Sequence, residues 1–145
     1  MKLFLKEEVP IETKKLALRI AAIVKEKKGE DVVVLDMRPQ ASFCDYFVIV
    51  SANSLRQVNA IAQAIAEDLS KVRIKPLSKA LSADESGWIA MDFSSVVAHI
   101  FYKPMREFYS LERLWSDAKR VRIEKKYSRP VNPRNKKVTR KLRAS

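Results

Sequence analysis

The chain has 145 residues, 47% of them apolar and 32% charged, an ordinary composition for one globular domain that argues against two. The formal net charge of +12 favours a polyanionic partner, nucleic acid first, over an acidic small molecule. A single cysteine, Cys44, excludes an intrachain disulfide framework. We find neither a signal-peptide pattern nor a membrane-spanning run, so we expect a cytoplasmic protein with no membrane partner.

Charge divides the chain after Ala118. Residues 119–145 hold 12 Lys and Arg against Glu124 alone and so carry +11 of the net charge. With few large apolar side chains, this tail cannot offset its ordering entropy, and we expect Tyr127–Ser145 to be disordered in isolation. It is either a solubilising extension or, as we favour, an arm that neutralises RNA phosphates. The basic residues expected to contact RNA are Arg134, Lys136, Lys137, Arg140, Lys141 and Arg143.

In the first half of the body, helical spacing of apolar residues predicts an amphipathic helix over 13–28, with Gly29 as its left-handed stop. Two short β-branched runs, 31–36 and 45–51, predict strands. Both are apolar at consecutive positions, which is typical of a sheet covered by helices on both faces. The Ser54 and Gln57 spacing is that of a capping box, and it predicts a helix from there to about Ser70.

In the second half, 74–77 is a candidate edge strand because Pro76 is tolerated best at an edge. Two apolar runs, 88–92 and 95–102, have hairpin spacing, and Pro104 begins an amphipathic helix that should end near Lys119. The predicted fold is therefore α/β (α+β): a mixed β-sheet of about five strands with helices packed on it, followed by the disordered basic C-terminal tail.

No catalytic or metal constellation is apparent. A lone histidine, His99, and a lone cysteine, Cys44, are too few for a structural zinc site, and each is more readily a buried side chain. Two isolated glycines cannot form a phosphate loop. The aspartates at predicted strand ends, Asp36, Asp45 and Asp92, form no Asp-x-Asp pair that could hold Mg²⁺. We expect no enzyme activity, no cofactor and no metal.

Aromatic and charged residues concentrate late in the body, and three or four of eight are expected to be exposed enough to bind a partner. The eight are Trp88, Phe93, Phe101, Tyr102, Arg106, Phe108, Tyr109 and Trp115. Together with the segments DYFVIVSANSLRQVNAIAQAI, ESGWIAMDFSSVVAHIF and REFYSLERLWSDA, they resemble the ribosomal silencing factor (Iojap-like) family. The resemblance covers roughly Lys14 to Ala118, and it makes residues 1–118 the family domain and 119–145 the tail.

The resemblance implies a nucleotidyltransferase-like fold without catalytic carboxylates. It implies a translation repressor that binds the large ribosomal subunit through ribosomal protein fourteen, sterically blocks subunit joining, and is a homodimer when free. The residues that it places at the partner surface are Trp88, Asp92, His99, Phe101, Arg106 and Tyr109, with Asp84, Glu85 and Asp92 supplying charge complementary to a basic partner.

One departure from the family pattern is Ser94-Ser95, where the family usually has Gly-Asp. Two alternatives stay open. A general basic RNA-binding protein would act through its tail and lose all ribosome association with residues 119–145. A nucleotidyltransferase-type enzyme would bind nucleotide with Mg²⁺ and lose this binding on Asp36→Asn or Asp45→Asn.

Overall fold

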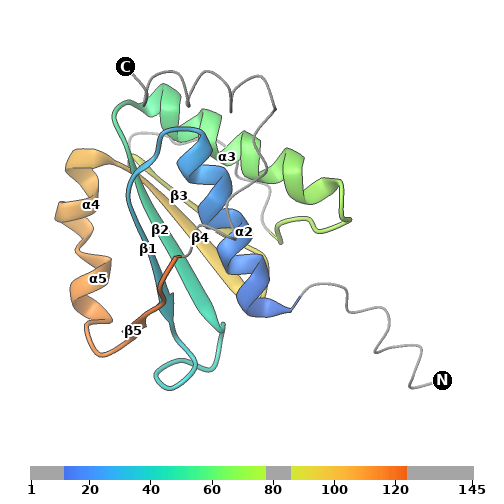
Figure 1. Cartoon of the computed structure of the whole chain (residues 1–145). Helices are drawn as coiled ribbons and strands as arrows, with labels where there is room; N and C mark the ends of the chain where they lie inside the picture. Colours follow the sequence, from blue (N-terminus) through green and yellow to red (C-terminus); the bar gives the residue numbers. More distant parts are fainter. Residues whose placement is uncertain (1–11, 78–85, 124–145) are drawn as a thin grey trace, which may run out of the picture.

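The computed structural model describes residues 12–77 and 86–123, which form one mixed β-sheet with helices on both faces (Figure 1). The strand order is β3-β4-β2-β1-β5. In chain order the elements are α2 (Thr13–Glu26), β1 (Glu30–Asp36), β2 (Tyr46–Ala52), α3 (Leu55–Ser70), β3 (Trp88–Asp92), β4 (Val96–Tyr102), α4 (Lys103–Tyr109), α5 (Leu111–Leu114) and β5 (Lys119–Arg120). The predicted fold class is confirmed.

The central strands are parallel and the outer ones antiparallel. β2 pairs with β4 in parallel, whereas the β1–β2, β3–β4 and β1–β5 pairs are antiparallel. Every residue of β2 is buried, because α2 and α3 cover one face of the sheet and α4 and α5 lie against the other (Figure 1). This arrangement explains why β2 is apolar at consecutive positions.

Side chains that alternate along the strands feed two separate cores. The larger core lies under α2 and α3 and contains residues such as Ile20, Val48, Ile65 and Ile100. The smaller one lies on the opposite face and contains Leu35, Met37, Cys44, Phe47, Ile49, Val97, Phe101 and Ala118. Partly buried aromatic residues pack against the smaller core alone, so its cover is incomplete.

Helix ends follow the predicted chemistry with two differences. Ser54 Oγ accepts a hydrogen bond from the Gln57 N–H at 3.1 Å, as predicted, but the Gln57 side chain accepts from the Asn53 N–H at 2.7 Å, one residue before the cap. The expected left-handed stop at Gly29 was wrong, since Lys28 takes that conformation with φ 64°. Gly29 is needed for another reason: a Cβ there would collide with the Val50 side chain.

The predicted hairpin of β3 and β4 is confirmed, and Ser94 in its turn has φ 76°. The predicted edge strand at 74–77 was wrong. Only the Leu77 N–H donates to this sheet edge, to the Asp92 carbonyl at 2.7 Å. Pro76 has no N–H to donate, and a single bond cannot define a strand.

The continuous C-terminal helix predicted from Pro104 to about Lys119 was also wrong. Ser110 has φ 47° and divides the segment into α4 and α5, and the chain then returns to the sheet as β5, paired with Leu35 and Asp36 of β1. The charge boundary after Ala118 thus falls one residue before β5, and Val121 and Ile123 pack against the larger core. The division into domain and tail stays a prediction.

Candidate functional site

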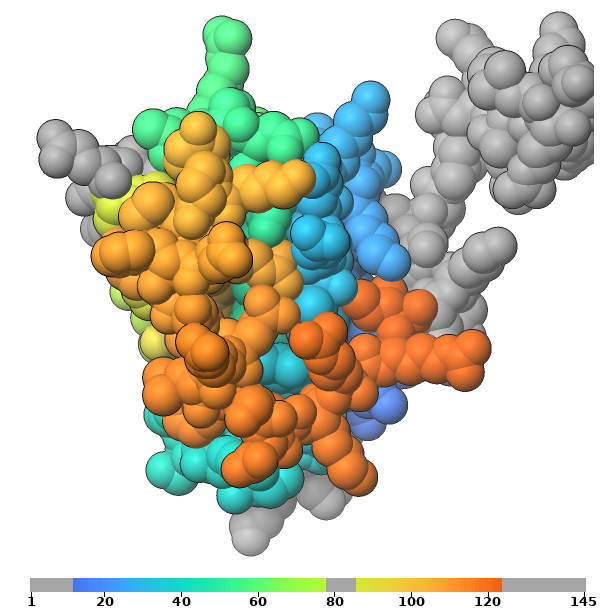
Figure 2. Space-filling model, turned by 90° about the vertical axis from the view of Figure 1, so that its left-hand side faces the viewer, coloured from blue at the N-terminus to red at the C-terminus, as the bar shows by residue number. Residues whose placement is uncertain are grey.

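A connected group of aromatic rings lies on the sheet face that α4 and α5 cover (Figure 2). Phe43, in the β1–β2 loop, contacts Trp115 with ring centroids 6.1 Å apart, and Trp88 of β3 contacts Tyr109 of α4 at 4.8 Å. Phe108 continues the group at 5.2 Å from Tyr109. We call these five residues the aromatic face: Phe43, Trp88, Phe108, Tyr109 and Trp115.

Much of this apolar surface is open to solvent. Phe108 is 74% exposed and Phe43 59%, and Leu114 beside Trp115 is 71% exposed. Among the described residues, five large apolar side chains are exposed, and three of them lie on or beside the aromatic face; the other two are Leu55 and Leu77. Contiguous exposed apolar surface is typical of a site that another macromolecule covers.

Beneath the face, Trp88 is held by a neighbour on β4. Its indole Nε1–H donates to His99 Nδ1 at 3.2 Å, and its ring stacks on Phe101 with centroids 5.1 Å apart. Trp88, His99 and Phe101 meet because β3 and β4 pair with Trp88 opposite Phe101. The orientation of the half-buried indole is therefore set by two buried side chains.

His99 is neutral in this environment. Its Nδ1 accepts a hydrogen bond, so the proton resides on Nε2, a buried atom with no hydrogen-bond partner among the described residues. The Phe47 ring packs edge-on at 4.4 Å. Burial lowers the pKa of His99 from 6.5 to about 4, because a charged imidazolium would lose its hydration there.

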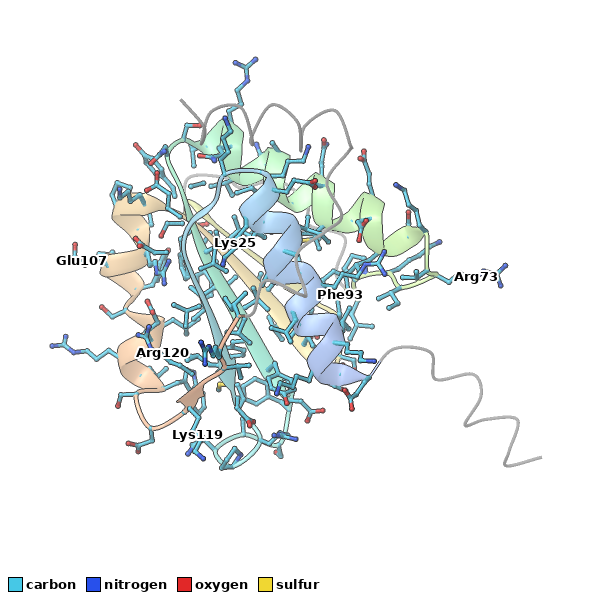
Figure 3. All side chains as sticks on the ribbon, in the orientation of Figure 1. Lys25, Arg73, Phe93, Glu107, Lys119 and Arg120 are labelled. Carbon is cyan, nitrogen blue, oxygen red and sulfur yellow. The ribbon has the colours of Figure 1, made fainter. Side chains whose placement is uncertain are left out.

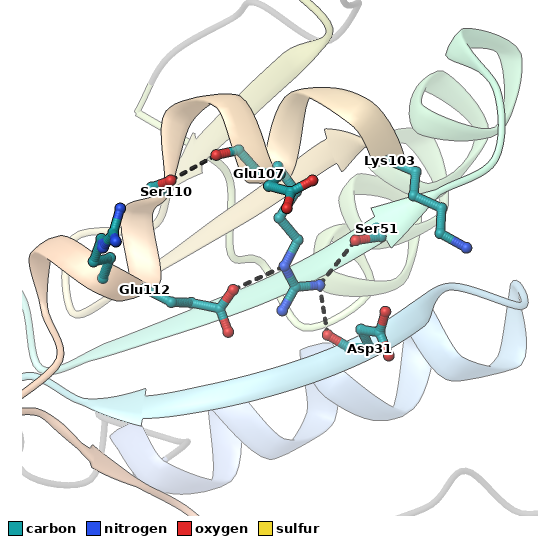
Figure 4. A pocket seen from close by; sticks show the side chains of 8 residues that line it. Asp31, Ser51, Lys103, Glu107, Ser110 and Glu112 are labelled. Carbon is teal, nitrogen blue, oxygen red and sulfur yellow. Dashed lines mark hydrogen bonds and ion pairs between the residues drawn. The ribbon is translucent and has the colours of Figure 1, made fainter.

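Arg106 is an internal tie between elements. Its Nη1 donates to the Asp31 carbonyl at 2.6 Å and to Ser51 Oγ at 2.9 Å, while Nε donates to Glu112 at 2.9 Å (Figure 4). The side chain is only 13% exposed. Asp31 has φ 50° in an irregular stretch of β1, and its carbonyl accepts from Arg106. This one guanidinium thus fastens α4 and α5 to β1 and β2.

A depression of about 460 Å³ opens beside Arg106, between α4 and the strand ends (Figure 4). Its lining balances three acidic side chains against three basic ones; the eight lining residues are Asp31, Ser51, Lys103, Arg106, Glu107, Ser110, Glu112 and Arg113. Glu107 points away from the sheet (Figure 3). With no excess of either sign, the depression does not favour a charged small molecule.

Asp92 lies at the other end of β3 from Trp88, with four residues of strand, about 13 Å, between the two ends. Its Oδ1 accepts from the Ser94 N–H at 2.7 Å, so this carboxylate stabilises the hairpin turn. Ser94-Ser95, the departure from the family pattern, belongs to the same turn and not to the aromatic face. Asp84 and Glu85, expected to add acidic charge, lie outside the described residues.

Three of the six predicted partner residues, Trp88, Phe101 and Tyr109, therefore meet in one place. His99 and Phe101 are 6% and 0% exposed, so any part they play in binding acts through Trp88. Of the eight late aromatic and charged residues, Phe108 alone is largely exposed, and Phe93 and Phe101 are buried. Phe43 was missed because a lone phenylalanine in a loop gives no periodic signal.

The expected chemistry of the remaining candidates is borne out in part. Cys44 is buried, and burial raises the pKa of its thiol to about 11. Asp36 is bound by two nitrogens of Arg38 at 2.9 and 2.7 Å, and this side chain holds the pKa of the carboxyl below its usual range. Within residues 12–77 and 86–123 no three His, Cys, Asp or Glu side chains gather as a metal site would require, and no helix there is long and apolar enough to cross a bilayer.

Comparison with known proteins identifies the family. The model of the family described as "Ribosomal silencing factor during starvation" matches residues 10–145. This chain belongs to the ribosomal silencing factor family. The match extends over the basic tail, which the resemblance in the sequence had left out.

Relatives support the same conclusion. The ribosomal silencing factor RsfS of Bacillus subtilis is 40% identical over 105 residues, 72% of this chain and 88% of the relative. The chloroplastic protein Iojap of Arabidopsis thaliana is 31% identical over 121 residues, 82% of this chain but 48% of the relative. A mouse protein named "Mitochondrial assembly of ribosomal large subunit protein 1" is 30% identical over 99 residues, 67% of this chain and 43% of the relative.

Solved structures show the same fold. A crystal structure from Bacillus halodurans matches with a TM-score of 0.61 at 33% identity, covering 72% of this chain and 95% of that one. Another from Chromobacterium violaceum matches with a TM-score of 0.68 over 81% of this chain and all of that one. At 23% identity the second supports the fold alone.

Proposed function

We propose that this ribosomal silencing factor represses translation by docking its aromatic face on ribosomal protein fourteen of the large subunit, where it sterically blocks joining of the small subunit. The observation that carries the proposal is the gathering of Phe43, Phe108 and Leu114, all exposed, around one group of packed rings. Aromatic side chains are enriched at binding hot spots. No bond is made or broken in this mechanism.

The mouse relative supports a large-subunit partner, since its name places it in the assembly of the large ribosomal subunit. On this proposal Phe43 and Phe108 enter the partner surface, and Trp88 and Tyr109 form the rigid floor between them. Arg106 acts at a distance, because it holds α4 in place from within. Asp92 lies farther along β3 and would contact the rim.

Sedimentation with separated ribosomal subunits tests the proposal. Phe108→Ala and Phe43→Ala remove side chains that are 74% and 59% exposed, so both variants should fold normally. Each should weaken binding to the large subunit by more than about 1 kcal/mol, roughly fivefold. The matched control is Leu77→Ala, which removes a side chain 71% exposed on a different segment and should bind as the unchanged protein does.

Trp88→Ala and Tyr109→Ala should weaken binding as well, provided that circular dichroism shows the fold intact. Large subunits preincubated with the protein should form fewer complete ribosomes in light scattering, and Phe108→Ala should restore their formation. Undiminished binding by both Phe43→Ala and Phe108→Ala would remove the aromatic face from the site.

A second candidate function is general RNA binding through the tail. Lys119, Arg120 and Arg122 are exposed where the described chain ends, and the segment that follows is strongly basic. Replacing Arg134, Lys136, Lys137, Arg140, Lys141 and Arg143 by Gln in the full chain separates the two functions. A flatter salt dependence with retained large-subunit binding supports an auxiliary tail, whereas complete loss supports the second candidate.

We further propose that the free protein is a cytoplasmic homodimer, as the family resemblance implies. Sedimentation equilibrium over a concentration series measures the mass directly. A monomer at every concentration would contradict the dimer without affecting the docking proposal.

A further inference from the structure

Helix α2 carries apolar side chains on the side that turns away from the sheet. Successive residues of an α-helix are ~100° apart, so Leu18 lies about 200° around the axis from Ile20, which is buried in the larger core. Ala22 lies one turn after Leu18 on the same outward ridge, and Lys14 lies one turn before it. Ordinary amphipathic patterning would place polar residues here.

These outward side chains are nevertheless buried. Leu18 is 1% exposed and Ala22 7%, although their neighbours Lys14, Lys15 and Lys25 are all exposed. Neither Leu18 nor Ala22 belongs to the two core clusters that the described residues form. The described helices and strands therefore leave the burial of this ridge unexplained.

The described chain ends beside this ridge. After β5, the Val121 N–H donates to the Val34 carbonyl at 2.8 Å, and Val121 and Ile123 pack against the larger core, on the α2 side of the sheet. Val121 also lines a depression of about 330 Å³ together with Thr13 and Lys14. The chain thus leaves β5 at the first turn of α2, and Leu18 lies only ~6 Å farther along the helix axis than Lys14.

Direction and length favour the same contact. β5 is antiparallel to β1, and the start of α2 lies beside the end of β1, so the chain leaving β5 runs in the direction of α2. Twenty-two residues follow Ile123, whereas an extended chain needs only about four residues to span the distance from Lys14 to Ala22. Tyr127 and Val131 are the first large apolar residues available in that stretch.

We propose that the segment after Ile123 packs lengthwise on the outward ridge of α2 and, with the lysines beside the ridge, forms one cationic face for an RNA backbone. Lys14, Lys15 and Lys25 flank the ridge, and the tail adds a large excess of positive charge. Apolar contact with Leu18 fixes the tail, while like-charged neighbours attract a row of phosphates more strongly together than apart. This face lies across the sheet from the aromatic face and does not depend on it.

Amide hydrogen exchange on the full chain tests the packing. Leu18→Glu should accelerate exchange in residues 124–145 by about tenfold or more, because it places a charge where an apolar contact is needed. Lys25→Glu is the matched control, since it changes an exposed residue of the same helix and should leave exchange of these amides unaltered. Leu18→Ala, a milder change, should give a smaller acceleration in the same amides.

Two outcomes would overturn the packing. One is accelerated exchange confined to residues 1–11, which would make the N-terminal segment the cover of the ridge. The other is unaltered exchange with an unaltered melting temperature in both Leu18 variants, which would mean that nothing covers the ridge.

Binding of a fluorescent 20-nucleotide poly(U) over a salt series tests the cationic face. Replacing Lys14, Lys15 and Lys25 by Gln should weaken binding about fivefold or more and lower the salt slope, by ~0.7 for each phosphate that the variant no longer neutralises. The matched control replaces Lys71, Arg73 and Lys75, which are exposed at and after the end of α3 (Figure 3 labels Arg73), and should change neither quantity. Equal effects of the two triple variants would reduce the face to nonspecific charge and overturn the proposal.

Discussion

The stability of the protein should fall in mild acid because of His99. In the fold, burial lowers the pKa of His99 from 6.5 to about 4, whereas the unfolded chain binds a proton near the ordinary value. Between these two values the unfolded state holds more protons than the folded state. The free energy of unfolding is therefore complete above pH 6.5 and declines as the pH falls toward 4.

The size of the effect follows from the two pKa values. A difference of 2.5 units corresponds to roughly 3 kcal/mol in all, of which about 2 kcal/mol should be lost between pH 8 and pH 5. Protonation would also turn Nδ1 into a donor facing the Trp88 Nε1–H, and so break the bond that orients Trp88. Asp36 and Glu30, whose pKa values are lowered, add losses only at lower pH.

Urea unfolding followed by the fluorescence of Trp88 and Trp115 at pH 8, 7, 6 and 5 measures the effect. His99→Phe is the control because it keeps an aromatic ring but cannot titrate. It should be less stable at pH 8 by about 1 to 3 kcal/mol, since the Trp88 N–H loses its acceptor, yet its stability should change little between pH 8 and pH 5. If both proteins lose the same free energy over that range, the reasoning about His99 is wrong.

Three further changes test single interactions, each by urea unfolding at pH 8. Ser54→Ala removes the side chain that caps α3 and should cost about 1 kcal/mol; no loss would show that the Gln57 contact with the Asn53 N–H suffices. Gly87→Ala places a Cβ 2.8 Å from Met105 Cγ at φ 69° and should cost about 1 to 3 kcal/mol; a neutral result would mean that α4 shifts freely. Arg106→Met leaves the Glu112 carboxylate and the buried Ser51 hydroxyl without their donor and should cost about 2 kcal/mol or more, much of it recovered by the additional change Glu112→Gln; an exposed-site cost below about 0.5 kcal/mol would contradict the internal tie.

Local patterns predicted much of the secondary structure. The helices α2 and α3 and the strands β1 to β4 each follow from residues that are neighbours in the chain, through apolar spacing, β-branched runs and the Ser54 cap. The resemblance rested on longer segments and identified the family correctly. These features depend on short-range preferences, which a sequence displays directly.

Elements whose stability comes from distant partners were mispredicted. The apolar period continues from Met105 to Trp115, but Ser110 turns left-handed between them, and α4 is tied to β1 and β2 through Arg106. β5 exists because its backbone pairs with Leu35 and Asp36, more than eighty positions earlier. Propensity alone could not reveal either feature, since two residues of Lys-Arg have no preference for a strand.

The sequence by itself determined the fold class, the family and the group of aromatic residues in which a site should be sought. Only the tertiary structure decided their roles: His99 and Phe101 became the buried support of Trp88, Arg106 an internal tie, and Phe43 and Phe108 the exposed surface. The reason is physical. Exposure depends on what packs over a side chain, and here that depends on elements far apart in the sequence that the sheet brings together.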